Sequence, residues 1–469
     1  MVFSSPVFLF VFLTAVYILY RIIPTITAKN ILLLIFSLFF YAYGESKAIV
    51  LMLVSILMNY AFGLAMKPGS SVRRKVFLTA GIAANLLMLG VFKYAGFAAS
   101  TLNLIPGVNI PVPEIALPIG ISFYTFQAMS YVIDAYKNPD YVQKNLYKLA
   151  LYITFFPQLV AGPIVKYYDF ADQIDNRKTT PEMTAQGIRR FITGLSKKLI
   201  IANTMAAAAD YVYGLEISQL SMSLAWLGAV SYLFQIYFDF SGYSDMAIGL
   251  GKMFGFTFRE NFNYPYISSS MQDFWRRWHI SVSTWFKEYL YIPLGGNRKG
   301  ELRTALNKIA VFFCTGLWHG ASLNFIVWGL INGGFMILES YKVINTEKWL
   351  KPFRHIYTMA VTVLAFVFFR ADTLTDACRF IGRMFDPISG GSEQTAMMLS
   401  QLTPVYILTL ISALIFSMPI WQKVRSRINS KELLIYGETS YYVISIVLLA
   451  VCIIILSSAS YNPFIYFRF

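Results

Sequence analysis

The sequence predicts an all-α, polytopic integral membrane protein, in which a bundle of helices crosses the bilayer. Of its 469 residues 57% are hydrophobic and only 13% are charged, whereas soluble proteins carry about 25% charged residues. The apolar residues form runs long enough for helical crossings of about 20 residues each. These runs are continuous, unlike the alternating segments of about ten residues in transmembrane barrels. We expect about ten to twelve helices.

The first apolar run, Pro6–Tyr20, is expected to be retained in the mature protein. Ser5 is a good N-cap and Pro6 suits a first helical turn. Met1–Ser5 carries no positive charge and no small-residue cleavage pattern follows, so a cleavable signal peptide is not indicated.

The remaining runs follow in order, without an internal repeat, a low-complexity tract or a long linker. They are Ile31–Tyr43, Ala48–Met66, Val76–Phe97, Ile115–Ile133, Leu146–Val165, Leu220–Phe240, Ile309–Ile337, Ile356–Phe369, Pro404–Ile420 and Tyr441–Ser458. One integral membrane domain, residues 1–469, is the simplest interpretation.

The net charge of +15 indicates membrane orientation rather than nucleic acid binding, because the cations sit in short loops between apolar runs. Lys67–Lys75 carries four cations, whereas Ala98–Glu114 has one acid and no base. The positive-inside rule therefore places the loop Lys67–Lys75 in the cytoplasm. It places the loop Ala98–Glu114 and the amino terminus outside. After Tyr136 the pattern blurs, which is typical of tilted, interfacial or re-entrant helices.

A first candidate site lies in DFWRRWHISVSTWFKEYLYIPLGG, Asp273–Gly296. A capping box at Ser270 predicts a helix that ends before the Pro-Leu-Gly-Gly sequence. On it Trp275, His279 and Ser283 would share one face. The stretch is too charged to span lipid, so we expect an amphipathic or re-entrant helix. An interfacial anchor in which His279 is merely hydrogen-bonded is an equally open interpretation.

The second candidate lies in CTGLWHGAS, Cys314–Ser322. If the helix is continuous, the eleven residues from Lys308 to His319 put His319 roughly 16 Å further along the axis. That is about half of a 30 Å hydrocarbon core, where an ionisable group indicates function. Gly316 and Gly320 permit close approach of a helix or a ligand. The alternative is a neutral histidine bonded to a neighbouring helix.

A third polar cluster is YFDFSGYSDMAIGLG, Tyr237–Gly251. Its carboxylates, Asp239 and Asp245, could pair with Arg276–Arg277 or orient a histidine. Structural ion pairing is the favoured interpretation, because acids inside a membrane need partners.

Other chemistry is not indicated. The three cysteines, Cys314, Cys378 and Cys452, form neither metal spacing nor a disulfide framework, and no P-loop, G-x-S-x-G or H-E-x-x-H motif is present. His355, beside Arg354 at a segment edge, is expected to be interfacial. A mid-membrane imidazole suits general-base activation of a hydroxyl, which matches acyl transfer from a thioester without a metal.

These motifs resemble the membrane-bound O-acyltransferase superfamily, and the likeness extends from end to end. DFWRRWHISVSTWFKEYLYIPLGG and GLWHG are similar to its signature regions. Several further motifs are similar to the bacterial alginate O-acetylase branch: MVFSSPVFLF, LPIGISFYTFQ (Leu117–Gln127), FFPQLVAGPIV (Phe155–Val165), YFDFSGYSDMAIGLG and NPFIYFRF (Asn462–Phe469).

The resemblance implies about eleven crossings with re-entrant helices around a tunnel, His319 as the essential residue and His279 as the second histidine. It also implies a multi-pass protein of the bacterial cytoplasmic membrane that moves acetyl groups outward, where a separate extracytoplasmic acetyltransferase modifies an alginate-like polysaccharide. With eleven crossings the carboxyl terminus is cytoplasmic.

We therefore expect an O-acyltransferase with acetyl-CoA as donor substrate, no bound cofactor, no metal and no nucleic acid partner. His319 is the expected base or orients the hydroxyl, and His279 bonds the acyl group or acceptor. The predicted tunnel and substrate contacts are Trp275, Trp278, Trp318, Arg276, Arg277, Asp239 and Tyr243. Arg276 and Arg277 would meet donor phosphates or lipid headgroups.

Two alternatives remain open at this point. One is D-alanyl transfer from a carrier protein to teichoic acid. The other is a transporter or polysaccharide-export subunit without chemistry of its own, although the paired broken helices typical of transporters are not found in the sequence.

Overall fold

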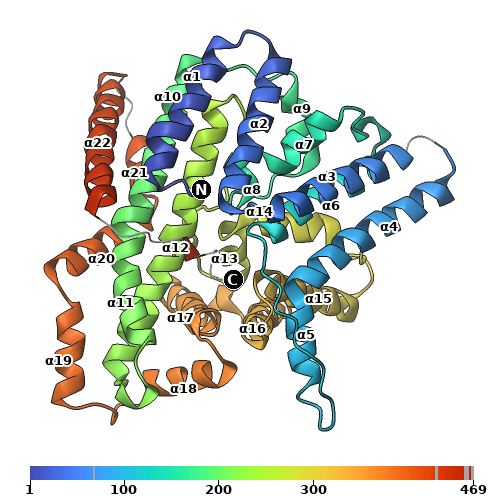
Figure 1. Ribbon diagram of the computed structural model, residues 1–469. Helices are drawn as coiled ribbons and strands as arrows, with labels where there is room; N and C mark the ends of the chain where they lie inside the picture. The colour runs from blue at the N-terminus through green and yellow to red at the C-terminus, as the bar shows by residue number, and fades with distance from the viewer. Residues whose placement is uncertain (67–68, 428–430, 459–463, 466–469) are drawn as a thin grey trace. The chain divides into compact units, whose positions relative to one another are not determined.

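The structure is a computed structural model that describes residues 1–66, 69–427, 431–458 and 464–465. Within these residues every regular element is a helix and none is a strand, which confirms the predicted all-α class (Figure 1). Lys67 and the ends of the closing motif, Asn462–Pro463 and Tyr466–Phe469, lie outside the described residues, so the predicted side of the carboxyl terminus is not tested.

Six described helical segments are long and apolar enough to cross a membrane, and a bent pair makes a seventh. Three of the six lie in the amino-terminal part of the chain: α2 (Ile26–Gly44), α3 (Ala48–Ala65) and the segment Ser71–Leu102, which contains α4 (Ser71–Leu89) and α5 (Ala95–Leu102). The other three are α16 (Leu323–Ser340), α17 (Lys351–Arg370) and the part Tyr436–Ser458 of α22 (Lys431–Ser458). The bent pair is α19 (Ser392–Gln401) with α20 (Pro404–Phe416). The chain is therefore a multi-pass membrane protein, and about eleven crossings stays a prediction.

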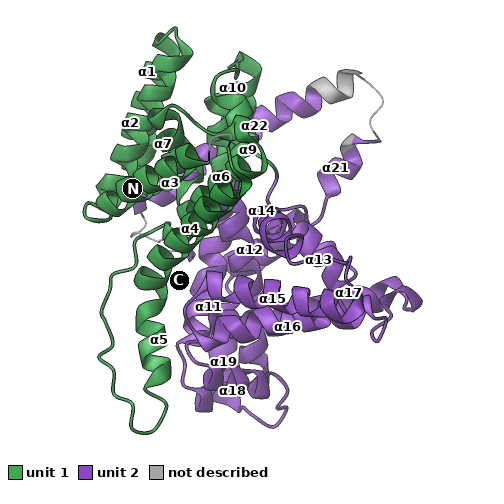
Figure 2. Cartoon of the chain, turned by 90° about the vertical axis from the view of Figure 1, so that its right-hand side faces the viewer, with its two compact units in different colours: residues 1–191, 246–259 green, residues 192–245, 260–469 purple. Residues whose placement is uncertain are grey.

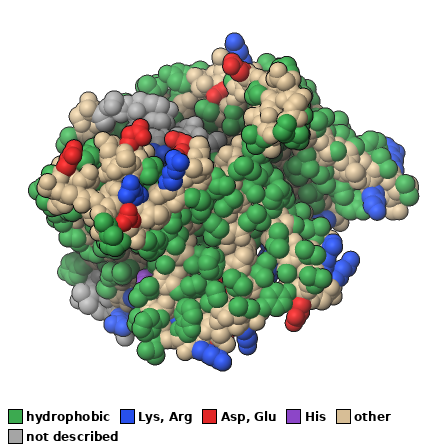
Figure 3. Space-filling model, turned by 90° about the horizontal axis from the view of Figure 1, so that it is seen from below, with side chains coloured by type: hydrophobic (Ala, Val, Ile, Leu, Met, Phe, Trp, Pro, Cys, Tyr) green, Lys and Arg blue, Asp and Glu red, His purple; other side chains and the backbone are tan. Residues whose placement is uncertain are grey.

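The exposed surface of these helices is apolar. Val50, Leu87 and Ile454 are each about three-fifths exposed or more. Figure 3 shows hydrophobic side chains over most of one face, with Lys and Arg mainly towards its edges. So much exposed apolar area is unfavourable in water and suits a lipid environment.

The chain divides into two compact units (Figure 2). Unit 1 contains residues 1–191 and 246–259, and unit 2 contains residues 192–245 and 260–469. Helix α12 (Met222–Met253) contributes residues to both. One domain over residues 1–469 stays a prediction.

Unit 1 is built around interlocking aromatic rings. The chain enters it through η1 (Val7–Leu13) and α1 (Thr14–Ile22), where Ser5 Oγ accepts from Phe8 N at 3.2 Å, as the predicted cap requires. Phe8, Phe12, Phe40 and Phe156 pack with ring centroids about 6 Å or less apart.

One apolar run predicted in unit 1 is divided into two short helices. Residues Leu146–Val165 form α7 (Leu146–Thr154) and the single turn α8 (Phe156–Leu159) rather than one helix, because the prolines at 157 and 163 cannot continue a helix interior. The remaining elements are η2 (Gly90–Tyr94), α6 (Ile121–Lys137), η3 (Pro139–Tyr141), α9 (Tyr167–Ile174) and most of α10 (Pro181–Ser196).

Unit 2 contains the two candidate histidine motifs. The predicted run Ile309–Ile337 is the end of α15 (Glu301–His319) followed by α16, because the chain turns at Gly320. The two helices pack closely: a Cβ at Gly316 would clash with the Phe325 carbonyl oxygen, and a Cβ at Gly329 with that of Phe312. The predicted close helix contact at Gly316 is confirmed.

Unit 2 also contains several shorter helical elements. They are η4 (Lys197–Ala202), α11 (Asn203–Tyr213), η5 (Ile217–Gln219), η6 (Pro265–Ile267), α13 (Met271–Arg277), α14 (Ile280–Phe286), η7 (Lys287–Tyr291), η8 (Thr346–Lys348), α18 (Leu374–Met384) and α21 (Ile420–Arg425).

Candidate functional site

The helix predicted to start at Ser270 is broken at His279. Ser270 Oγ accepts from Asp273 N at 3.0 Å, so the predicted start is confirmed. Helix α13 ends at Arg277 and α14 begins at Ile280, with His279 between them in the left-handed region at φ 43° and ψ 53°. The prediction that Trp275, His279 and Ser283 share one continuous helix face is therefore wrong.

The physical reason for the break is Asn261, a fully buried residue of the preceding segment. Its backbone oxygen accepts from Ile280 N at 2.9 Å. Its Oδ1 accepts from Ser281 N at 3.1 Å and Ser281 Oγ at 2.9 Å, and lies 3.2 Å from His279 Nδ1. Its Nδ2 donates to Ser244 Oγ at 3.0 Å. These bonds outside the helix stabilise a backbone conformation that costs on the order of 1–3 kcal/mol.

Helix α16 holds α13 in place at two points. Glu339 accepts from the first backbone N–H groups of α13, Met271 N at 2.6 Å and Gln272 N at 3.0 Å, a favourable place for a carboxylate. Trp275 Nε1 donates to Asn332 Oδ1 at 3.1 Å. Trp275 is thus buried and anchored to α16.

His319 is the last residue of α15 and is 4% exposed. Its ring lies among three aromatic rings: Trp318 at 4.8 Å, Trp328 at 5.0 Å and Phe369 at 5.2 Å between centroids. The predicted continuous helix from Lys308 to His319 is confirmed.

The structure brings the two predicted histidines together. The ring centroids of His279 and His319 lie 6.1 Å apart, and Trp318 lies 5.8 Å from His279. Phe240 of α12 contacts the His279 imidazole edge-on at 4.5 Å. The two imidazoles therefore belong to one buried cluster of rings.

The environment of His279 favours the uncharged form of its imidazole. It is fully buried and lies outside the helices that qualify as membrane spans, and burial lowers the pKa of its side chain to about 3. Within the described residues no hydrogen-bond partner meets its Nε2. A neutral imidazole with a free nitrogen can accept a proton or bond a substrate.

The carboxylates of the third cluster form ion pairs, as favoured from the sequence. Asp239 pairs with Lys198 at 2.5 Å, and both side chains are almost completely buried. Asp239 Oδ2 also accepts from Ile465 N at 2.7 Å. Asp245 pairs with Lys197 at 2.7 Å. These ion pairs thus use the lysines of η4 rather than Arg276–Arg277.

The remaining predicted residues take different places. Arg277 Nε donates to Asp273 Oδ1 at 2.9 Å, whereas Arg276 is exposed. Trp278 is buried and packs on Phe366 at 5.3 Å. Tyr243 packs edge-on against Phe464 at 4.7 Å. Their predicted roles as substrate or tunnel contacts stay predictions.

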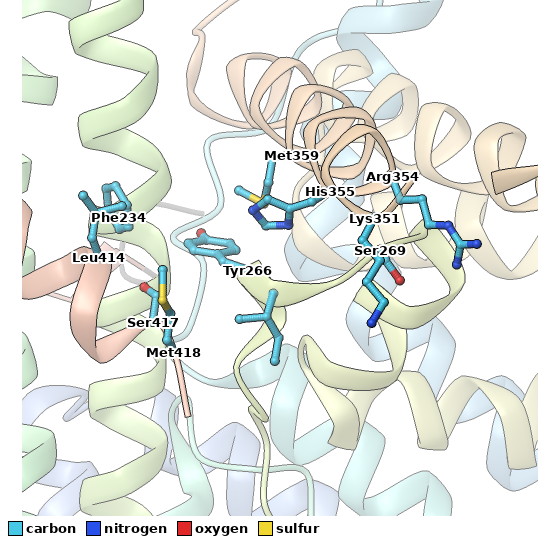
Figure 4. A pocket seen from close by; sticks show the side chains of 11 residues that line it. Phe234, Tyr266, Ser269, Lys351, Arg354, His355, Met359, Leu414, Ser417 and Met418 are labelled. Atoms are coloured by element: carbon cyan, nitrogen blue, oxygen red, sulfur yellow. The ribbon is translucent and has the colours of Figure 1, made fainter. Parts of the chain in front are cut away.

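His355 lies in a separate cavity of about 480 Å³ within unit 2 (Figure 4). Its Nδ1 is 3.2 Å from the Ser268 carbonyl oxygen. The cavity has apolar walls that include Phe234, Met359 and Leu414, and cationic side chains, Lys351 and Arg354, on another side. Tyr266, which also lines the cavity, stacks on Trp278 at 6.3 Å, but neither His279 nor His319 is a lining residue.

Sequence reasoning missed two residues of the site, Asn261 and Trp328. Asn261 lies in the irregular NFNYP sequence, where an asparagine indicates only a turn. Trp328 is spaced as an ordinary core position of an apolar helix. Its indole Nε1 is buried without a hydrogen-bond partner among the described residues, which makes it a donor available beside His319.

Comparison with known proteins connects this site to a family. The model of the membrane-bound O-acyltransferase family matches residues 142–375, which include both histidines. The chain is 39% identical over 505 residues to a probable alginate O-acetylase of Azotobacter vinelandii, with all of both chains covered.

It is also 42% identical over 421 residues to the corresponding protein of Pseudomonas aeruginosa, which covers 88% of this chain and 80% of that one. A teichoic acid D-alanyltransferase of Bacillus subtilis is 30% identical over 261 residues, 53% of this chain and 65% of the other.

Proposed function

The chain belongs to the membrane-bound O-acyltransferase family, and we propose that it moves acetyl groups from a cytoplasmic thioester to the O-acetylation of an alginate-like polysaccharide outside the membrane. The observation that carries the proposal is the pair of buried imidazoles, His279 and His319, 6.1 Å apart. The end-to-end likeness to alginate O-acetylases supports the acetyl group and the acceptor class.

His319 acts in this scheme as the general base. An acceptor hydroxyl oxygen attacks the carbonyl carbon of the thioester while its proton passes to the imidazole. The C–S bond then breaks, the new ester C–O bond remains, and the imidazole returns the proton to the thiolate. The aromatic rings around His319 exclude water, which protects the thioester from hydrolysis.

His279 assists by hydrogen bonding to the acyl group or to the acceptor hydroxyl through Nε2. Trp275, Trp278 and Trp318 line the path of the acyl group, with Asp239 and Tyr243 supporting it. Arg276 and Arg277 meet donor phosphates or lipid headgroups through charge-assisted bonds. Acetyl-CoA is the donor substrate in this proposal.

The proposed setting is the bacterial cytoplasmic membrane, with the amino terminus outside and the carboxyl terminus inside. The cation-rich loop at Lys67–Lys75 supports this orientation. A separate extracytoplasmic acetyltransferase is the expected protein partner, which receives the acetyl group or places it on the polymer.

The test uses purified full-length protein with acetyl-CoA that carries a labelled acetyl group. We expect CoA release and label transfer that depend on His319, and no turnover of a D-alanyl carrier protein. Turnover of the D-alanyl carrier alone would replace the proposal by D-alanyl transfer. Binding without turnover of either donor, together with unchanged polymer acetylation after loss of both histidines, would indicate a transport subunit.

A further inference from the structure

We infer that Asn261 is a positioning residue for the acyl transfer: it fixes the turn and the tautomer of His279, so that Nε2 is the imidazole atom that meets the reactants. The inference rests on the proposed role of His279. It starts from a residue whose side chain is fully buried and whose Oδ1 and Nδ2 atoms are both hydrogen-bonded.

The orientation of the Asn261 amide follows from its neighbours. The Ser281 backbone N–H can only donate, and it lies 3.1 Å from Oδ1. The amide oxygen must therefore face Ser281, which leaves Nδ2 to donate to Ser244 Oγ at 3.0 Å. The reverse amide orientation would set two N–H donors against each other.

The tautomer of His279 follows in turn. Its Nδ1 lies 3.2 Å from Asn261 Oδ1, and an amide oxygen can only accept. The proton of the neutral imidazole must therefore sit on Nδ1, so that the lone pair is on Nε2. This nitrogen is buried and has no partner among the described residues, as expected for an atom kept for a substrate.

Asn261 also fixes the direction of the ring. Its backbone oxygen and Oδ1 hold Ile280 N and Ser281 N, the first residues after the left-handed turn. The ring of His279 then lies among the rings of Phe240, Phe262, Trp318 and His319. Of these neighbours only His319 is titratable, so the two imidazoles are the groups whose protonation a pH profile would report.

The experiment compares Asn261→Ala and Asn261→Asp in the full chain, with Asn263→Ala as matched control. Asn263 is exposed and belongs to the same segment. We measure kcat and KM for labelled acetyl-CoA across pH. Asn261→Ala should lower kcat roughly 10- to 100-fold through misplacement of the imidazole, with KM little changed. The control should stay near the wild-type value.

Asn261→Asp separates positioning from simple folding. A carboxylate still accepts from Nδ1, but its negative charge raises the pKa of the neighbouring imidazole. The acidic limb of the profile should therefore move to higher pH while much of the activity at alkaline pH returns. Equal losses in both variants with an unmoved limb would overturn the inference, because a purely structural role predicts that result.

Two further measurements keep the outcomes distinct. In a His279→Ala background, Asn261→Ala should cause no further loss, and an additive loss would overturn the inference. If His279→Ala is inactive while Asn261→Ala is fully active, the inference about Asn261 is also overturned. If His279→Ala itself is fully active, the proposed role of His279 is overturned instead. Because the chain has three histidines, selective ¹⁵N labelling should resolve the Nε2 of His279 as unprotonated.

Discussion

His279 and His319 lie with ring centroids 6.1 Å apart although they belong to different segments of the chain. His319 ends a continuous helix, whereas His279 occupies a left-handed break between two short ones. Each is held by its own neighbours, α16 packing behind one and Asn261 holding the other. The positions of both imidazoles are therefore fixed by the surrounding structure, which suits a reaction that needs fixed distances between catalytic groups.

The first prediction concerns the close packing of α15 on α16. Gly316→Ala should destabilise the protein by roughly 1–3 kcal/mol, because the new Cβ would clash with the Phe325 carbonyl oxygen. Thermal unfolding in detergent measures the loss. Gly334→Ala on α16 is the control, since a Cβ there meets nothing within 4 Å and a helix interior favours alanine by up to about 1 kcal/mol. Equal melting temperatures would contradict the packing.

The second prediction concerns the two ion pairs of α12. Asp239→Ala should cost about 3–5 kcal/mol, because it leaves the charge of Lys198 buried. Asp245→Ala should cost less, since its partner Lys197 is 23% exposed and water can solvate it. Urea unfolding or melting curves compare the variants. A larger loss of stability for Asp245→Ala than for Asp239→Ala would show that burial does not determine which ion pair contributes more to stability.

Those parts of the fold that depend on neighbouring residues in the sequence could be predicted, whereas those that depend on contacts between distant segments could not. Apolar runs predicted the membrane helices, and the Lys308–His319 helix was found because nothing in it interrupts the helix. The break at His279 was missed because its cause, Asn261, lies in a different segment and acts through tertiary hydrogen bonds. The i, i+4 pattern there is compatible with a helix, and tertiary contacts override such a pattern.

The same distinction applies to the site. His319 and His279 stood out as rare ionisable residues in apolar surroundings, and the favoured ion pairing of Asp239 followed from the same rule. Its partner, Lys198, could not be identified because the charge pattern gives no distances. Trp328 carried no signal of its own, since only its buried indole N–H beside His319 distinguishes it from a core tryptophan.

The third prediction is that thiol chemistry is not used. Replacement of Cys314, Cys378 and Cys452 by Ala should leave substantial acetylation. Cys314 lies on α15 five residues before His319, which at about 100° per residue puts the two on different helix faces. Mass spectrometry of protein quenched during turnover checks this. A trapped acyl group on Cys314 would show a covalent cysteine route instead of direct transfer.

The fourth prediction concerns orientation. Single cysteines at Ser70 and Asn109 in the cysteine-free chain are both placed at exposed positions. An impermeant thiol reagent on intact cells should label position 109 and spare position 70 until the membrane is opened, because cationic loops face the cytoplasm. The reversed pattern would invert the chain and remove the support for outward acetyl movement.

The most direct test of the account is the activity of His319→Ala, measured as the acetyl content of the exported polymer and as label transfer by the purified protein. The variant should accumulate in the membrane like the wild type and lose about 10²–10⁴-fold in rate, the usual contribution of general-base catalysis. His355→Ala, whose imidazole lies in the separate cavity, should lose little. Near-full activity of a normally accumulated His319→Ala would contradict the assignment of this imidazole as the catalytic base.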